Sequence, residues 1–175
     1  MSILFLPGQK PENREWINQF AELVSKCSDS STVVHEYRSW VFPELDIDPE
    51  YEIDLFAKYN PDCVIAKSLG TLLCALAIER GLIAPKAIVL VGIPLSGIGE
   101  TELKWFSNLG TVGSKVLVIQ QTSDRVGRFD KVHDSLPTQN YTFKEVQGSD
   151  HKYSNVVELS EICLGWLSKY QLTSA

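Results

Sequence analysis

Three residues that lie far apart in the sequence have the side chains that nucleophilic catalysis on an acyl group requires. They are Ser68, Asp124 and His151, and each follows a run of strand-like composition. A serine hydroxyl attacks a carbonyl once a base removes its proton, and the imidazole base needs a carboxylate that fixes its tautomer and stabilises its charged form. The order serine, aspartate, histidine along a chain is one of the known solutions. We therefore predict that the three side chains meet and catalyse acyl transfer.

The segment around Ser68 has the composition of a tight corner between a strand and a helix. Apolar residues 63–66 precede the serine, and an apolar helical pattern begins at Leu69. Ala66 and Gly70, two positions before and two after the serine, remove the side chains that would collide where the backbone reverses sharply. The hydroxyl would then project from the corner, beside the free N–H of Leu69, which is placed to donate to an oxyanion.

The serine and the histidine each have a competing interpretation. A serine after a strand is often only the N-cap of the next helix, because its oxygen accepts from N–H groups of the first turn. The small-x-Ser-x-small spacing at Ser68, together with an acid and an imidazole downstream, favours a nucleophile. His35 lies within a predicted strand and His133 within a predicted helix. His151 lies in a predicted loop and is therefore the preferred base.

The acidic partner is chosen among three aspartates. Asp124 lies in a loop just past a strand, although an aspartate there is also a common turn former. Asp150 is the immediate neighbour of His151, and adjacent side chains on an extended segment tend to point apart. Asp124 is therefore the preferred partner, with Asp130 and Asp150 as the alternatives.

Strand-like runs alternate with helical patterns along the chain. The predicted strands cover residues 3–6, 32–37, 63–66, 87–91, 115–120 and 141–146. The predicted helices cover residues 13–27, 48–59, 69–80, 100–108 and 128–136, followed by a last amphipathic helix after His151. Asn13 and Asp48 are the expected N-caps of the first two helices, and residues 38–43 are an expected loop. This alternation predicts a three-layer α/β/α sandwich with a mostly parallel six-stranded sheet.

The carboxyl ends of the strands form the edge where ligands of such sheets bind. The residues that follow the strands at this edge include Pro7-Gly8-Gln9, Ser68, Asp124 and His151. A nucleophile, an acid and an imidazole are therefore expected at one edge of the sheet, although they come from separate loops.

Composition limits the classes of function. The chain has 175 residues, 44% of them hydrophobic, which suits a single domain over residues 1–175 with one sizeable core. Its net charge of −6 opposes nucleic-acid binding, because contacts to phosphates need clustered Lys and Arg. The N-terminus lacks the pattern of a signal peptide, and the longest uncharged apolar stretch, between Lys67 and Glu79, is shorter than the roughly 20 residues of a membrane span. A cytoplasmic protein without membrane or nucleic-acid partners is expected.

Metal and cofactor motifs are absent from the sequence. The four cysteines lie in apolar patterns without the spacing of metal ligands, so buried free thiols are expected at Cys27, Cys63, Cys74 and Cys163. Three scattered histidines do not form a zinc set. Neither a G-x-G-x-x-G at a helix start nor a P-loop motif is present. We expect no cofactor and no metal.

The motifs around the three polar residues resemble those of the α/β-hydrolase superfamily, and in particular its compact serine hydrolases without a lid. The resemblance covers nearly the whole chain: the corner at Ser68 is similar to the family's nucleophile elbow, residues 121–126 to its acid loop, and residues 148–151 to its histidine loop. It implies the strand order 2-1-3-4-5-6. It also implies that Ser68 is the nucleophile, His151 the general base and acid, and Asp124 the orienting carboxylate.

The same resemblance implies an oxyanion hole made of the Leu69 N–H and one N–H of the first loop, from either Gly8 or Gln9. Three positions depart from the common family pattern: alanine replaces glycine at Ala66, proline replaces histidine at Pro7, and lysine replaces histidine at Lys67. The departure at the first loop leaves both candidate N–H groups open.

Lys67 and several large apolar residues bear on substrate binding. Lys67 either forms a salt bridge to an acidic loop residue or steers an anionic substrate. The residues that could line an acyl pocket are Trp40, Phe42, Ile98 and Trp105. The segment 92–113, where larger relatives insert a lid, is short, so we expect no lid domain, an open site and a small acyl substrate.

The sequence therefore favours a serine hydrolase that cleaves a small ester, thioester or related acyl bond through an acyl-enzyme on Ser68. The alternative from another class is a protein of the same fold that binds a small molecule or a protein partner with little or no turnover. Within enzymes, an acyltransferase or a peptidase stays open.

Overall fold

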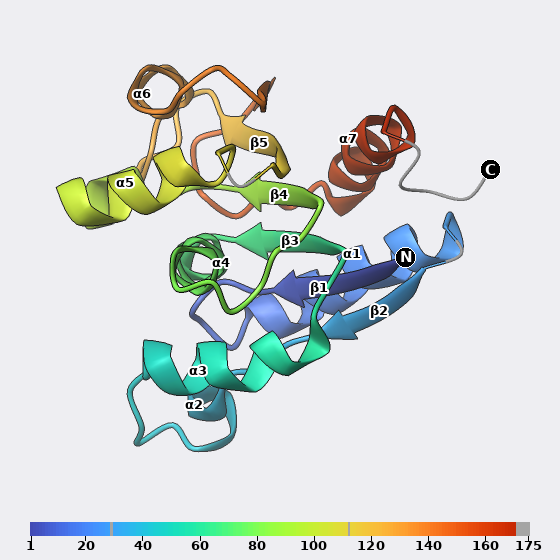
Figure 1. Ribbon diagram of the computed structural model, residues 1–175, viewed down its shortest axis with the longest axis vertical. Helices are drawn as coiled ribbons and strands as arrows, with labels where there is room; N and C mark the ends of the chain where they lie inside the picture. Colours follow the sequence, from blue (N-terminus) through green and yellow to red (C-terminus); the bar gives the residue numbers. More distant parts are fainter. Residues whose placement is uncertain (29, 112, 171–175) are drawn as a thin grey trace.

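Six parallel strands form the central sheet. The computed structural model describes residues 1–28, 30–111 and 113–170. The strands are β1 (Ser2–Leu6), β2 (Ser31–Val34), β3 (Cys63–Lys67), β4 (Ala87–Val91), β5 (Lys115–Gln121) and β6 (Tyr141–Val146). Every neighbouring pair runs parallel, and the order across the sheet is β2-β1-β3-β4-β5-β6 (Figure 1). The implied strand order is confirmed.

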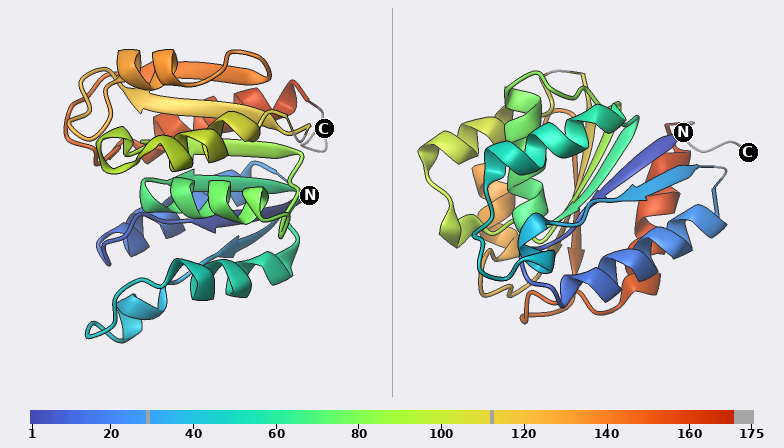
Figure 2. Two further views of the ribbon diagram at one scale, coloured as in Figure 1. Left: turned by 60° about the vertical axis from the view of Figure 1, so that its left-hand side comes forward. Right: turned by 90° about the horizontal axis from the view of Figure 1, so that it is seen from below.

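Helices cover both faces of the sheet. They are α1 (Asn13–Lys26), α2 (Arg38–Val41), α3 (Pro49–Phe56), α4 (Leu69–Glu79), α5 (Glu100–Asn108), α6 (Phe129–Ser135) and α7 (Val156–Ser168), with 3-10 turns at Ala57–Tyr59 and Leu95–Gly97. α1 and α7 pack together on one face, whereas α3, α4 and α5 lie on the other (Figure 2). The predicted three-layer α/β/α sandwich is confirmed.

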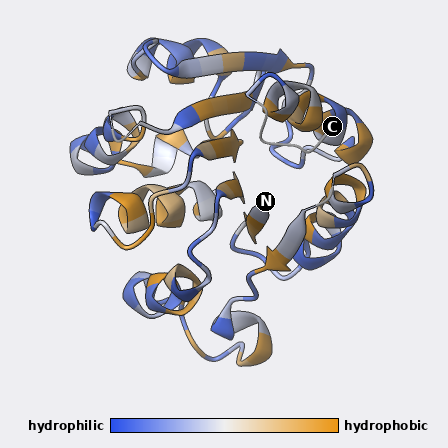
Figure 3. Ribbon diagram, turned by 45° about the vertical axis from the view of Figure 1, so that its right-hand side comes forward, coloured by the Kyte–Doolittle hydropathy of each residue, from blue (hydrophilic) through white to orange (hydrophobic). Residues whose placement is uncertain are grey.

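The alternation of side chains along each strand divides the core into two apolar clusters. In β3, Val64 and Ala66 face α3, α4 and α5, whereas Cys63 and Ile65 face α1 and α7. All four side chains are buried. The central strands β1, β3 and β4 are likewise apolar and almost wholly buried, and they form much of the hydrophobic centre in Figure 3. Lys67 continues the alternation of Cys63 and Ile65, which directs its side chain toward α1.

Two expected boundaries are wrong in the segment between β2 and α3. β2 ends at Val34, so His35 and Tyr37 lie beyond the strand, and residues 38–41 form the short helix α2 instead of a loop. Packing overrides local propensity here, because the rings of Tyr37 and Trp40 are buried and meet edge to face, with their centroids 5.4 Å apart.

The two expected N-caps have different outcomes. Asp48 caps α3, where its side chain accepts from two N–H groups of the first turn at 3.1 and 3.3 Å. Asn13 is the first residue of α1 and does not cap it, since the N-cap position is Glu12. The Asn13 side chain accepts a hydrogen bond from Lys67. The Asn13 side chain therefore makes a tertiary hydrogen bond instead of the expected capping bond.

Two expectations from composition are tested by the structure. Cys63, Cys74 and Cys163 are buried free thiols as predicted, but Cys27 is exposed, because it is the C-cap of α1 in the turn that leads to β2. In the described ranges, none of the helices has both the length and the apolar character needed to cross a lipid bilayer.

β1 and β3 lie side by side where the winding of the chain reverses, and this brings the first loop against the start of α4. The Gly70 N–H donates to the Pro7 carbonyl at 3.1 Å. A Cβ added at Gly70 would lie only 2.4 Å from the Leu6 carbonyl oxygen. The small residue two positions after Ser68 is therefore required by the neighbouring strand as well as by the turn.

The substitution Gly70→Ala should lower the free energy of unfolding by at least about 2 kcal/mol, because the backbone must move to relieve the overlap. Gly165→Ala is the matched control: Gly165 is exposed in α7, and an added Cβ would meet nothing within 4 Å. Alanine there should raise the free energy of unfolding by about 0.5–1 kcal/mol. Urea unfolding followed by circular dichroism measures both changes, and unaltered stability of Gly70→Ala would contradict the close approach.

Candidate active site

Ser68 occupies a strained corner between β3 and α4. Its backbone has a φ of 49° and a ψ of −115°, a combination that residues with side chains rarely adopt. The Ser68 N–H donates to the Val91 carbonyl at 3.0 Å, and the Ser68 carbonyl accepts from the N–H and the hydroxyl of Thr71. Within the described helix start, the serine side chain makes no capping hydrogen bond. The corner is thus held by its backbone, and the hydroxyl is available to another partner.

Ser68, His151 and Asp124 form a continuous chain of hydrogen bonds. Ser68 Oγ lies 2.9 Å from His151 Nε2, and His151 Nδ1 lies 2.7 Å from Asp124 Oδ2. Because an ionised carboxylate only accepts, Nδ1 carries the ring proton, and Nε2 accepts from the serine hydroxyl. The structure therefore brings the three side chains together from the loops or corners that follow β3, β5 and β6.

Asp124 is a buried carboxyl group with several hydrogen-bond donors. Only 1% of the residue is exposed. Oδ1 accepts from the Val126 N–H at 2.9 Å, and Oδ2 accepts from the Tyr153 hydroxyl at 2.8 Å as well as from His151. Burial alone would raise the pKa of Asp124, but the hydrogen bonds, led by the one from His151, outweigh burial and lower this pKa. Asp124 is therefore ionised at neutral pH and can orient the imidazole.

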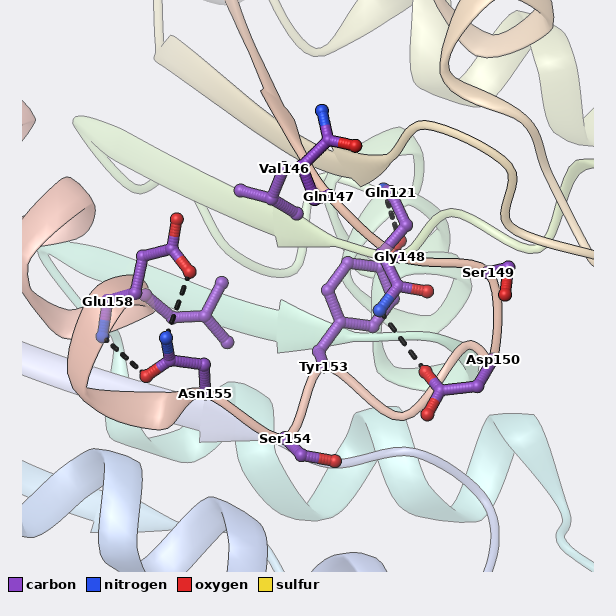
Figure 4. Close-up of a pocket in the computed structure, with 11 residues that line it drawn as sticks. Gln121, Val146, Gln147, Gly148, Ser149, Asp150, Tyr153, Ser154, Asn155 and Glu158 are labelled. Carbon is purple, nitrogen blue, oxygen red and sulfur yellow. Dashed lines mark hydrogen bonds between the residues drawn. The ribbon is translucent and has the colours of Figure 1, made fainter.

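The loop that carries His151 is fixed by Gln121, the last residue of β5. The side-chain oxygen of Gln121 accepts from the His151 N–H at 3.0 Å. Its side-chain nitrogen donates to Asp150 at 3.2 Å, as Figure 4 shows. An added Cβ at Gly148 would lie 2.4 Å from that nitrogen, so the loop passes directly over the amide. His151 itself has a φ of 62°, which shows that the loop holds the imidazole in an uncommon backbone conformation.

The first loop, residues 7–9, is anchored by two side chains from the segment after β2. The Tyr37 hydroxyl donates to the Pro7 carbonyl at 2.6 Å, and Trp40 Nε1 donates to the carbonyl of the last loop residue at 2.8 Å. The C=O and N–H of a trans peptide point in opposite directions. Holding the Pro7 carbonyl therefore also fixes the direction of the Gly8 N–H.

The start of α4 leaves one N–H beside the serine without a partner. The first N–H groups of a helix have no acceptor within the helix. The Gly70 and Thr71 N–H groups donate to the carbonyls of Pro7 and Ser68, but the Leu69 N–H has no acceptor among the residues that the structure describes. This N–H is free to donate to a ligand near the Ser68 hydroxyl.

Lys67 does not form the salt bridge that was one of its two expected roles. Its Nζ donates to Asn13 Oδ1 at 2.7 Å and lies 4.7 Å from the centroid of the Trp16 ring. In the described part of the chain, no carboxylate pairs with it. Burial lowers the pKa of Lys67 to about 8, although the charges of Asp150 and Asp124 act in the opposite direction.

A cavity of about 600 Å³ opens beside the serine. Its lining residues are Gln9, Lys10, Glu12, Asn13, Trp16, Lys67, Ser68, Arg125, Asp150, His151, Lys152 and Ser154. Since Ser68 and His151 both contribute, a molecule bound there would lie next to the serine hydroxyl. We call this space the Ser68 cavity.

The apolar residues expected to line an acyl pocket do not line the Ser68 cavity. Trp40 is buried in the core, and Ile98 and Trp105 pack against the apolar cluster on the α4 face of the sheet. Phe42 is about half exposed. The first three side chains thus pack in or against the core. A sequence pattern does not distinguish a core residue from one that lines a pocket.

The remaining candidate histidines and aspartates have other contacts. His35 Nε2 lies 2.7 Å from a carboxylate oxygen of the buried Glu52. His133 lies on α6. Asp130 pairs with Arg128, and Asp150 accepts from the side-chain amide of Gln121. Among the described residues, no three His, Cys, Asp or Glu side chains gather as a metal site would require.

Two residues that support the site were not singled out from the sequence. Gln121 holds the histidine loop, and the Tyr153 hydroxyl joins Asp124 to the Gln121 backbone N–H at 2.9 Å. The available signal was the pair Gln120 and Gln121 at the end of an apolar strand, since a buried polar side chain needs a specific partner. Tyr153 gave no signal beyond its position two residues after the histidine.

The parallel sheet order and the strand-to-helix corner at Ser68 are those of the α/β-hydrolase fold. The alpha/beta hydrolase domain family matches residues 42–161, which is more than half of the chain. The protein therefore belongs to the alpha/beta hydrolase domain family. No curated protein matches the sequence significantly.

Solved structures of hydrolases share this fold. An α/β serine hydrolase homologue from Coxiella burnetii has a TM-score of 0.73 at 17% identity, covering 95% of this chain and 85% of that chain. The esterase domain of a Rhodothermus marinus protein has a TM-score of 0.67 at 13% identity, with 96% and 86% covered. A type II thioesterase from the yersiniabactin pathway has a TM-score of 0.57 at 12% identity, with 95% and 91% covered. Family and fold together support a hydrolase.

The substitution Tyr153→Phe removes a hydroxyl that accepts from one buried group and donates to another. The Gln121 N–H would be left without an acceptor, so the free energy of unfolding should fall by about 1–3 kcal/mol. Tyr170→Phe, at a position that is 39% exposed, is the control and should change stability by less than about 0.5 kcal/mol. Equal urea-unfolding midpoints for the two variants would contradict the assigned contact.

Lys67 should make stability depend on pH in the alkaline range. Its pKa is about 8 in the folded protein, against the 10.5 of an unperturbed lysine in the unfolded chain, so the unfolded chain binds the proton more tightly. The cost of burying the ammonium is therefore fully present below pH 8 and is lost as pH rises from 8 to 10.5. The free energy of unfolding of the parent protein, measured relative to Lys67→Met, should rise across this window by up to about 3 kcal/mol. A flat difference would contradict the burial of a charged amine, and Lys104→Met on the exposed surface of α5 serves as the control.

Proposed function

We propose that the protein is a serine hydrolase that cleaves a small ester or thioester through an acyl-enzyme on Ser68. The observation that carries the proposal is the hydrogen-bond chain from Ser68 Oγ through His151 to Asp124, with distances of 2.9 and 2.7 Å. Such a chain supplies the base that a serine nucleophile needs and the carboxylate that orients the base. The esterase and thioesterase that share the fold agree with this reaction class.

In the proposed first half-reaction, Ser68 Oγ attacks the substrate carbonyl carbon and His151 Nε2 takes the hydroxyl proton. The buried carboxylate of Asp124 stabilises the imidazolium that forms. The negative oxygen of the tetrahedral intermediate would accept from the free Leu69 N–H and from one N–H of the first loop, with Gly8 and Gln9 as the candidates. His151 then protonates the leaving group, and the acyl group stays on the serine.

In the second half-reaction, a water molecule enters the position of the leaving group. His151 takes its proton, the hydroxide oxygen attacks the acyl carbon, and the Ser68–acyl bond breaks with the proton returned to Oγ. The Ser68 cavity includes the serine in its lining, and its volume of about 600 Å³ is sufficient for a small substrate. A small acyl substrate is thus favoured over a polymer.

A fluorophosphonate probe should label the protein, and the substitution Ser68→Ala should abolish that labelling. The same change should lower kcat/KM for phenyl butyrate by at least about 10³-fold, because the covalent route is lost. Ser96→Ala is the matched control, since Ser96 is exposed and lies outside the cavity. Labelling that persists in Ser68→Ala would show that another residue is the nucleophile. A parent protein that is neither labelled nor active would favour the alternative of a binding protein with this fold.

A further inference from the structure

The Ser68 cavity carries more positive than negative side chains, although the chain as a whole has a net charge of −6. Its basic residues are Lys10, Lys67, Arg125 and Lys152, and its acidic residues are Glu12 and Asp150. A concave site focuses the field of the charges that line it. The excess of basic groups is therefore local and coincides with the nucleophile.

The four basic residues of the cavity are not neutralised by ion pairs. In the described part of the chain, the lysine and arginine residues that form salt bridges all lie outside the cavity lining: they are Arg14, Lys26, Arg80, Lys86 and Arg128. Glu12 and Asp150 offset two of the four positive charges, and the donors to Asp150 Oδ1 are neutral, namely Gln121 Nε2 at 3.2 Å and the Lys152 N–H at 2.9 Å. Positive charge is thus left available beside the serine.

Among these basic residues, Lys67 is the best placed to pair with an anionic ligand. It is only 5% exposed, and its one hydrogen-bond partner among the described residues is the neutral amide of Asn13. An ammonium group has three donors, and a buried cation without a carboxylate partner is costly to maintain. Trp16 offers its ring face at 4.7 Å, which tolerates a cation but does not neutralise it. These contacts leave two of the three ammonium donors of Lys67 without a partner among the described residues.

We propose that the Ser68 cavity accepts acyl substrates that carry an anionic group close to the bond that is cleaved, and that Lys67 is the residue that pairs with this anion. Arg125 and Lys152, both exposed at the cavity, would attract the same group from solvent. The proposal rests on the proposed serine hydrolase activity and adds its substrate class. The expected effect is a preference, measured as the ratio of kcat/KM for an anionic ester to kcat/KM for a matched neutral ester.

Two pairs of matched esters test the proposal and locate the anionic group. Phenyl hemisuccinate and phenyl butyrate share the leaving group and a four-carbon acyl chain, and differ by a terminal carboxylate. The butyrate esters of 3-hydroxybenzoate and 3-hydroxybenzamide share the acyl group and differ by a carboxylate in the leaving group. With hydrolysis in the absence of enzyme subtracted, the anionic member of one pair should have a kcat/KM at least about tenfold higher, which corresponds to about 1.4 kcal/mol.

The substitution Lys67→Met should reduce that anionic-to-neutral ratio by about tenfold, whereas Lys104→Met on α5 should leave it unchanged. Because Lys67 is buried, the exposed double variant Arg125→Gln, Lys152→Gln provides a second test that does not disturb the core, and it should lower the ratio at low salt by about threefold or more. A ratio near one or below in both ester pairs, with the neutral esters still cleaved, would overturn this inference alone. A parent protein that cleaves none of the four esters and resists the fluorophosphonate probe would overturn the proposed function together with it.

Discussion

The contact between the start of α4 and the end of β1 is the constraint on which the site depends. Gly70 approaches the β1 backbone so closely that its N–H reaches the Pro7 carbonyl, and a single added carbon would overlap the carbonyl oxygen of Leu6. This approach is possible because β1 and β3 are neighbours at the point where the winding of the sheet reverses. It joins the serine corner to the first loop, so the Leu69 N–H and the N–H groups of that loop share one rigid frame.

The polar groups around this frame are arranged by opposing electrostatic demands. Asp124 keeps its charge in a buried position because its oxygens accept from the His151 ring, the Val126 N–H and the Tyr153 hydroxyl. Burial raises the pKa of Tyr153 far above its usual range, so its hydroxyl remains a donor to that carboxylate at all ordinary pH values. Lys67 is also buried, but the groups in contact with its ammonium, the Asn13 amide and the Trp16 ring, are neutral. Asp124 is thus a buried negative charge with several hydrogen-bond donors, whereas Lys67 is a buried positive charge with one hydrogen-bond acceptor among the described residues.

The sequence was sufficient for the sheet and for the three side chains of the hydrogen-bond chain, but not for what surrounds them. The alternating patterns predicted the strands, and the family resemblance implied their order. The corner at Ser68 followed from small residues at a fixed spacing. The cavity lining was missed because Trp40 and Ile98 look alike as core or as pocket residues in a linear pattern. The role of Asn13 was missed for a similar reason: its side chain is equally suited to cap α1 or to accept from a lysine that lies 54 positions away.

The first loop shows why such supporting contacts are polar and distant in the sequence. Tyr37 holds the loop through its hydroxyl, and its ring is packed edge to face against His35, with the centroids 5.3 Å apart. His35 is bonded to the buried Glu52 of α3, whose second oxygen accepts from the Arg38 N–H at 3.0 Å. An apolar cluster in this place would tolerate small slips, because dispersion has no preferred direction. Hydrogen bonds between buried groups do not tolerate such shifts, since each lost partner leaves a desolvated polar atom. α3 and the segment after β2 therefore hold the first loop at one position, as the proposed oxyanion hole would require.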